Sequence, residues 1–153
     1  MTSPEEQFVE LTKCNTPVTE AQIERIFNEL KPVRPSFLIG EWDGGGLDTG
    51  HPGHKTLVAM KWAGKSFRSV DDADPIVVLD ETGRRVCSEK WGHSSLREVV
   101  FRGVTSAAMI YDNKPIFDHF RYVHDDMVLG VMDCPKVMGA DSFYYFFLRR
   151  RKD

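Results

Sequence analysis

The sequence contains few cysteines, and their arrangement excludes a disulfide scaffold. Its 153 residues include three of them, Cys14, Cys87 and Cys134, at wide separations. Small secreted domains that depend on disulfides carry many cysteines, usually in even number. We therefore expect free thiols, a reducing compartment and a cytoplasmic location.

Long apolar segments and a strong excess of one charge are also missing. No apolar run approaches the ~20 residues of a membrane-spanning helix, and the N-terminus is too acidic and polar for a signal peptide. The net charge of −3 gives no reason to expect a polyanionic partner such as nucleic acid. The one basic cluster, residues 149–152, is interpreted as a solvated tail.

Several motifs that mark common chemistries are absent. The chain has no glycine-rich phosphate loop before a helix, no nucleophile elbow and no Cys/His zinc pattern. His51 and His54 have a metal-like spacing, but no third ligand follows nearby. We therefore expect no metal and no cofactor. His93 lies in a predicted loop, and we assign it no role.

The N-terminal segment, residues 1–35, is predicted to be helical. Residues 3–6 read as an N-cap, a proline in the first turn and a capping-box glutamate. A second helix over 19–30 has apolar residues at the spacing of one buried stripe, Ile23, Ile26, Phe27 and Leu30. Pro32 and Pro35 then end helical structure.

After Pro35 the pattern changes to short β-type runs separated by turn residues. We predict strands over 36–43, 66–70, 75–80, 84–88, 96–103, 104–112, 116–123, 126–132 and 142–149, with 57–62 ambiguous between helix and strand. Such spacing favours one antiparallel sheet that closes on itself and so removes exposed edges. The expected fold is mainly β. It is a single domain over 1–153 with an antiparallel β-barrel at 36–150, closed by the 19–30 helix.

Trp42 lies in the glycine-rich segment Gly40–Gly46, directly after an apolar run. A Gly-x-Trp on an early strand is similar to the signature of lipocalin-type barrels, in which the tryptophan plugs one end. The alternative is a bulged strand with an ordinary core tryptophan. Trp42 is also a candidate ligand-binding residue.

The predicted strand 116–123 carries unusual polar residues. Alternation places one set on one face, Phe117, His119, Arg121 and Val123, and the other set on the opposite face, Asp118, Phe120 and Tyr122. Burying His119 and Arg121 without partners is costly. Their face is therefore interpreted either as a polar-lined cavity that binds a carbonyl or carboxylate, or as an exposed polar surface.

These patterns give two sets of candidate site residues. The candidate acids and bases are His51, His119 and Asp118, because imidazole titrates near neutrality and carboxylates transfer protons. The candidate ligand-binding residues are Trp42, Tyr111, Lys114, Arg121, Phe117, Tyr144 and Phe146. Tyr144 and Phe146 share one face of the aromatic strand, and Tyr111, Lys114 or Arg121 would stabilise an enolate or carboxylate.

Longer motifs connect the chain to a known family. The first half holds Gly40-x-Trp42-x-Gly44, Thr49-Gly50-His51-Pro52 and Trp62-x-Gly64-Lys65-x-Phe67. The second half holds 108–112, 115–123, 130–133 and 146–149. Over roughly residues 20–150 the chain resembles the GXWXG-domain family, followed by the domain of unknown function that usually accompanies it. This resemblance implies a small lipocalin-like (calycin) barrel and supplies no settled activity.

A second resemblance is to nitrobindin-type haem barrels. Gly40, Trp42, Gly44 and Gly46 fit their glycine-rich motif, whereas Asp48 stands in place of its last glycine. The haem ligand of that family is a histidine on a late strand. The corresponding strand here, 143–149, has none, so the resemblance gives no haem site.

The leading functional hypothesis is a barrel that binds a small hydrophobic molecule in a polar-lined cavity. The alternative is a cofactor-independent isomerase, cyclase or lyase acting on a small, natural-product-like carbonyl substrate in the same cavity. A third reading is a partner-binding module with a filled barrel. We expect a small-molecule ligand or substrate as partner, with a homodimer left open, and neither nucleic acid nor a membrane.

Overall fold

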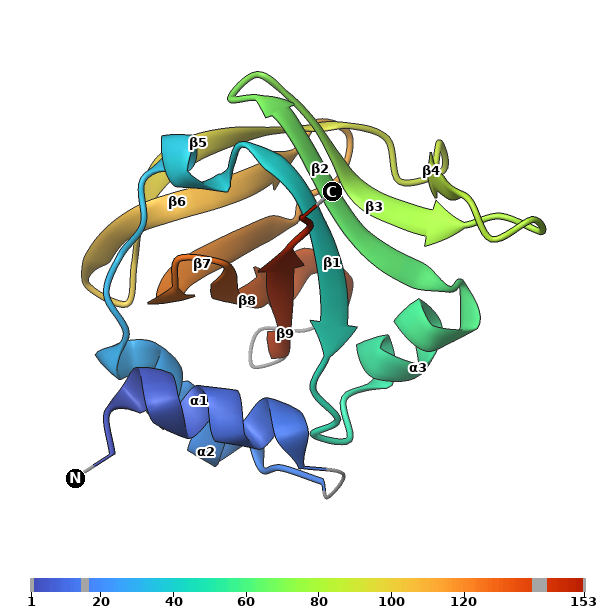
Figure 1. Cartoon of the computed structure of the whole chain (residues 1–153). Coiled ribbons are helices and arrows are strands. Elements are labelled where there is room, and N and C mark those ends of the chain that lie inside the picture. The colour runs from blue at the N-terminus through green and yellow to red at the C-terminus, as the bar shows by residue number, and fades with distance from the viewer. Residues whose placement is uncertain (1, 15–16, 139–142, 153) are drawn as a thin grey trace.

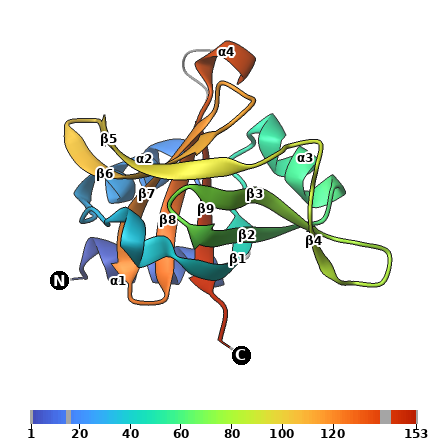
Figure 2. The same cartoon turned by 90° about the horizontal axis from the view of Figure 1, so that it is seen from above.

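The computed structural model describes residues 2–14, 17–138 and 143–152, and its strands form one antiparallel sheet (Figures 1 and 2). The strands are β1 (Gly40–Gly46), β2 (Trp62–Ser69), β3 (Asp72–Leu79), β4 (Arg85–Cys87), β5 (Ser94–Phe101), β6 (Val104–Tyr111), β7 (Phe117–His124), β8 (Met127–Asp133) and β9 (Phe143–Arg150). Their order is β2-β1-β9-β8-β7-β6-β5-β3-β4. Because β2 also pairs with β3, eight strands close into a barrel and β4 extends it outside. The predicted mainly β, antiparallel barrel is confirmed.

Two N-terminal helices, α1 (Pro4–Lys13) and α2 (Glu20–Glu29), lie side by side against one wall of the barrel (Figure 1). Ser3 and Thr19 cap them as the sequence predicts, accepting the backbone N–H of Glu6 at 3.1 Å and of Gln22 at 3.2 Å. No helix in the described ranges is both long and apolar enough to cross a membrane.

The prediction that the 19–30 helix closes the barrel is wrong. The apolar stripe of α2 packs on the outer surface of β7, β8 and β9, and Phe27 meets the outward-facing Tyr145 edge to face. This buried layer contains Phe8, Ile23, Ile26, Phe27, Leu30, Leu47, Val123, Met127, Leu129, Val131, Tyr145 and Phe147. An amphipathic helix packs its apolar stripe against whatever apolar surface is available. For α2 that surface is the outer face of β7, β8 and β9.

Some boundaries also differ from expectation. Residues Pro35–Leu38 form a 3₁₀ turn, η1, so the strand predicted at 36–43 begins only at Gly40. The ambiguous segment 57–62 is the end of α3 (Pro52–Ala59) and the start of β2. The short helix α4 (Pro135–Met138) was not predicted. Residue 142, the predicted start of the last strand, lies outside the described residues.

Trp42 closes one end of the barrel. Its side chain is fully buried, and its Nε1–H donates to the carbonyl oxygen of Leu38 in η1 at 2.7 Å. The Arg150 guanidinium lies 4.3 Å from the indole centroid and donates to the carbonyl oxygen of Phe37 at 2.9 Å. The indole is therefore packed, hydrogen-bonded and covered, as a plug requires.

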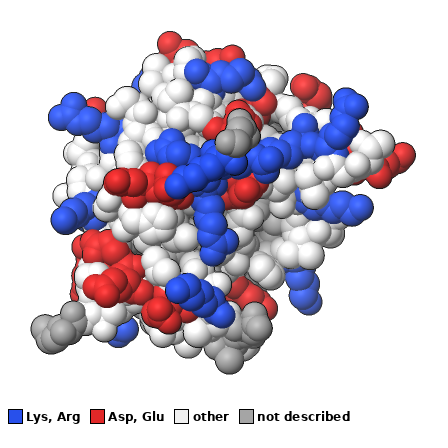
Figure 3. Space-filling view, in the orientation of Figure 1, with Lys and Arg blue, Asp and Glu red and all other residues white. Residues whose placement is uncertain are grey.

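The basic cluster at residues 149–152 is not simply a solvated tail. Arg149 and Arg150 belong to β9, and the Arg150 guanidinium covers Trp42. Arg151 pairs with Asp43 at 2.7 Å and Lys152 with Asp126 at 2.7 Å. On this face basic and acidic side chains lie interleaved (Figure 3).

Replacing Trp42 by alanine should destabilise the protein by about 3–5 kcal/mol, because a large buried side chain and its hydrogen bond are lost. Urea unfolding followed by circular dichroism measures the change. Trp91→Ala, at a half-buried loop tryptophan, is the matched control and should cost clearly less. Equal losses for the two variants would show that Trp42 is not a plug.

Candidate functional site

A cavity of about 80 Å³ opens at the barrel end opposite Trp42. The short helices α3 and α4 and the loop before β5 border it, and the ends of several strands form its floor. Its lining is almost entirely apolar and consists of Gly53, Thr56, Leu57, Trp91, Ile116, Met132, Cys134, Val137 and Tyr144. Such a pocket suits an apolar ligand body.

Two opposite charges lie deeper in the barrel than this lining. Asp118 follows Ile116 by two positions, so its side chain points to the same interior. Lys65 Nζ lies 2.9 Å from Asp118 Oδ2, and the side chains are 2% and 0% exposed. Lys65 Nζ also donates to the carbonyl oxygen of Pro75 at 2.8 Å and lies over the ring of Phe146 at 5.1 Å.

Alternation from Phe67 places Lys65 on the interior face of β2, opposite Trp42, and an irregularity in the strand brings Trp62 to the same side. The pairing of β2 with β3 shifts register on both sides of Gly64, which has φ +144°. A side chain at Gly64 would collide with the carbonyl oxygen of Trp42. The irregular backbone lets both Trp62 and Lys65 contact the barrel interior, although strict alternation would separate them.

Burial moves the ionisation of this cluster towards neutral forms. Burial raises the pKa of Asp118 and Lys65 opposes the shift, whereas burial lowers the pKa of Lys65 and Asp118 opposes that shift. Burial and then the Asp118 charge raise the pKa of Tyr111 well above its ordinary value and that of Cys134 to about 11. Perturbed groups of this kind concentrate at functional sites.

Several buried polar atoms of this cluster have no well-directed hydrogen bond to any described residue. They are the Tyr111 hydroxyl, both carboxylate oxygens of Asp118 and Trp62 Nε1. The contact between Lys65 and Asp118 is thus an ion pair that leaves hydrogen-bonding capacity on the carboxylate. Unmet capacity costs about 1–3 kcal/mol per group, and a polar group that entered the interior could satisfy it.

The histidine-rich loop before α3 lies at the rim of the cavity. Tyr144, which lines the cavity, has its hydroxyl 3.0 Å from His54 Nδ1 and its ring 5.5 Å from that of His51. His51 caps α3 by accepting the N–H of Gly53 at 2.9 Å, and burial lowers its pKa. His54, in α3, thus helps to hold Tyr144, and His51 is at the rim rather than among the deep polar groups.

The prediction that His119 and Arg121 share a ligand-accessible space with His51 is wrong. Both point outward from the barrel, and Arg121 donates to the carbonyl oxygens of Phe27 and Leu30 at 3.1 and 3.0 Å. Carbonyls at a helix C-terminus lack partners within the helix, so α2 satisfies the buried guanidinium. His119 stacks on Phe101 with ring centroids 3.9 Å apart and meets Asp133 at 3.3 Å.

The other candidate residues divide between the interior and the surface. Asp118, Trp42, Tyr111, Tyr144 and Phe146 face the barrel interior. By contrast, Phe117 is 40% exposed on the outer side, and Lys114 covers Trp91 at 5.3 Å near the rim. Their roles in binding or catalysis stay predictions.

Lys65 is the residue that the sequence reasoning missed as a site residue. Its signal was a lysine two positions before Phe67 in a strand with an internal glycine. Glycine in a strand often marks a bulge, and a bulge changes which residues face the core.

Breaking the Lys65–Asp118 pair from one side should be strongly destabilising. We expect Lys65→Met and Asp118→Asn each to lose about 3–5 kcal/mol, because one buried charge or polar group stays without its partner. The double variant Lys65→Met/Asp118→Leu should recover much of that loss, measured by urea unfolding. The control is Asp71→Asn, which breaks the exposed pair with Arg97 and should cost under ~1 kcal/mol. A loss for Asp118→Asn no larger than this control would contradict the expectation.

The buried His119 should make the protein less stable in acid. Burial lowers the pKa of His119 below its ordinary value of 6.5, so the unfolded chain binds the proton more readily. Stability should therefore fall as the pH drops from about 6.5 through the folded-state pKa, and His119→Gln should flatten this dependence in thermal melts. His124→Gln, at the exposed end of the same strand, is the control. An unchanged pH profile in His119→Gln would refute this account.

Comparisons with known proteins agree with this architecture. Residues 25–83 match the family described as GXWXG protein, and residues 92–150 match a domain of unknown function, DUF4334. The crystal structure of a protein from Thermomonospora curvata is similar to this chain at 38% identity, with 99% of this chain and 100% of that chain covered and a TM-score of 0.91. The comparison with curated proteins gives no match. With Gly40, Trp42 and Gly44 in its first strand, the chain belongs to the GXWXG family and continues into that domain of unknown function.

Proposed function

We propose that the barrel binds a small, mostly apolar molecule that carries one polar oxygen group. The observation that carries this proposal is the position of Tyr111 and Asp118. Their oxygens have Lys65 and each other as polar neighbours, keep unused hydrogen-bonding capacity, and lie in the barrel interior below an apolar cavity. The apolar body of the ligand would occupy the cavity, and its oxygen would meet the Tyr111 hydroxyl.

The size of the cavity limits the ligand. Its volume of about 80 Å³ is smaller than the roughly 150 Å³ of a protein cavity that binds benzene. A compact molecule of a few heavy atoms fits without rearrangement. A larger ring needs displacement of α3 or α4, the short helices that border the opening.

A second candidate function is cofactor-independent proton transfer on a small carbonyl compound. The observation that favours it is a carboxylate with a raised pKa and unused hydrogen-bonding capacity close to a phenol. Asp118 would remove a proton next to the carbonyl, and the Tyr111 hydroxyl would donate a hydrogen bond to the enolate oxygen. The Lys65 cation would limit the build-up of negative charge. A base and a hydrogen-bond donor to the enolate are the groups that such an isomerase or lyase would use.

Filling the cavity should abolish binding. We expect 2-butanone, with five heavy atoms, to shift backbone NMR signals of residues around the cavity in the unmodified protein, and 2-methylbutane, which lacks the oxygen, to bind at least tenfold more weakly. Leu57→Trp should remove the response because the indole occupies the cavity. Val58→Trp, 65% exposed on the same helix, should keep it.

The same samples in deuterated water separate the two functions. Exchange of the protons next to the 2-butanone carbonyl, lost in Asp118→Asn, indicates proton transfer, whereas binding without exchange indicates a binding protein. Circular dichroism checks that each variant is folded. The absence of any saturable response in the unmodified protein, or an equal response in Leu57→Trp, would overturn the proposal.

A further inference from the structure

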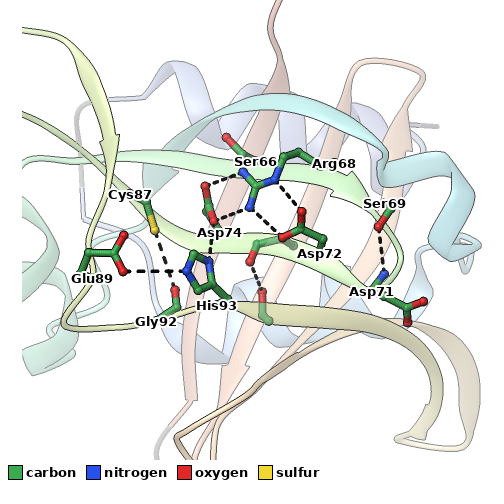
Figure 4. Close-up of polar contacts among 12 residues, drawn as sticks. Ser66, Arg68, Ser69, Asp71, Asp72, Asp74, Cys87, Glu89, Gly92 and His93 are labelled. Carbon is green, nitrogen blue, oxygen red and sulfur yellow. Dashed lines mark hydrogen bonds and ion pairs between the residues drawn. The ribbon is translucent and has the colours of Figure 1, made fainter.

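A second polar cluster lies on the outer side of the barrel. It contains Asp74 from β3, Cys87 from β4 and His93 from the loop just before β5 (Figure 4). One ligand atom from each residue lies within 4.8 Å of the others. A carboxylate oxygen, a sulfur and an imidazole nitrogen at this spacing are a donor set for a transition metal.

The surrounding contacts orient two of the donors. His93 Nδ1 lies 2.9 Å from Asp74 Oδ1, and its Nε2 lies 3.8 Å from the carboxylate of Glu89. Arg68 Nη1 and Nη2 donate to the two oxygens of Asp74 at 2.7 and 2.8 Å. Figure 4 shows Asp74 between Arg68 and His93, so the guanidinium holds the carboxylate without lying between it and the imidazole.

We propose that Asp74, Cys87 and His93 bind a divalent zinc-type metal ion. The ion takes the position of the proton shared by His93 Nδ1 and Asp74 Oδ1, and the Cys87 thiol releases its proton to solvent as the sulfur ligates. Water completes a tetrahedral set. With Nδ1 on the metal, the other ring N–H faces Glu89, the arrangement in which an outer carboxylate fixes a ligating histidine.

The local charges favour a cation. Asp72, Asp74 and Glu89 place three carboxylates around the site, against the single guanidinium of Arg68. Metal binding to such a site releases protons.

The site would tie an otherwise loosely attached element to the barrel. β4 has three residues and pairs only with β3 among the described strands. A metal on Asp74, Cys87 and His93 would link β3, β4 and the approach to β5. This role is structural and independent of the cavity.

Cobalt(II) is the probe, because a thiolate ligand gives it an intense near-ultraviolet charge-transfer band. Titration of the reduced full-length protein should produce this band with a stoichiometry of one. The band should disappear in Cys87→Ser and persist in Cys14→Ser, the matched variant at an exposed cysteine just after α1. His93→Gln, which leaves Asp74 with Arg68, should weaken binding at least tenfold, and zinc should displace the cobalt.

The outcomes decide the proposal whichever variant folds. No thiolate band in the unmodified protein, or an unchanged band in Cys87→Ser, overturns it. If Cys87→Ser unfolds, unchanged cobalt affinity in His93→Gln overturns it instead. Leu57→Trp should bind cobalt like the unmodified protein, so failure of cavity binding and failure of metal binding are separate results.

Discussion

A lysine and an aspartate of opposite charge lie inside the barrel, and the interior is arranged around this pair. Neither charge could be buried alone, because desolvation of a single ion costs several kcal/mol. Strand β2 brings Lys65 into the interior on the same face as Phe67, and β7 places Asp118 beside it. Aromatic rings of Trp62 and Phe146 surround the ammonium group. This pair makes the barrel interior polar directly below the apolar cavity.

Strand β7 serves two environments through simple alternation. Its inward residues, Asp118 and Phe120, belong to the barrel interior, while His119 and Arg121 belong to the layer under α2. Each buried polar side chain has a different partner. Asp118 has an opposite charge, Arg121 has helix carbonyls, and His119 has a stacked ring and a carboxylate. The same strand therefore anchors the N-terminal helices and carries a group of the candidate site.

The sequence was sufficient for the class of fold, because turn residues, helix caps and alternating apolar residues are local signals. Ser3, Thr19 and the stripe on α2 are of this kind. It could not decide which face of β7 points inward, because alternation defines two faces without naming the one that meets the core. Lys65 was missed because the strand was predicted to begin at residue 66, whereas β2 begins at Trp62 and includes it. The Asp74, Cys87 and His93 cluster was hidden because its members are neighbours only after β3 and β4 pair.

Because of the order of the strands, neither of the two family regions can form the barrel without the other. β1 and β2 belong to the first region, yet β1 pairs along its length with β9, the last strand of the second. Neither region alone can close a sheet, so each one taken alone would present open strand edges. Cutting the chain between the two regions would therefore leave two unpaired sheet edges rather than two folded units. The two regions are complementary parts of one wall, so a change in strand length at β1 needs a matching change at β9.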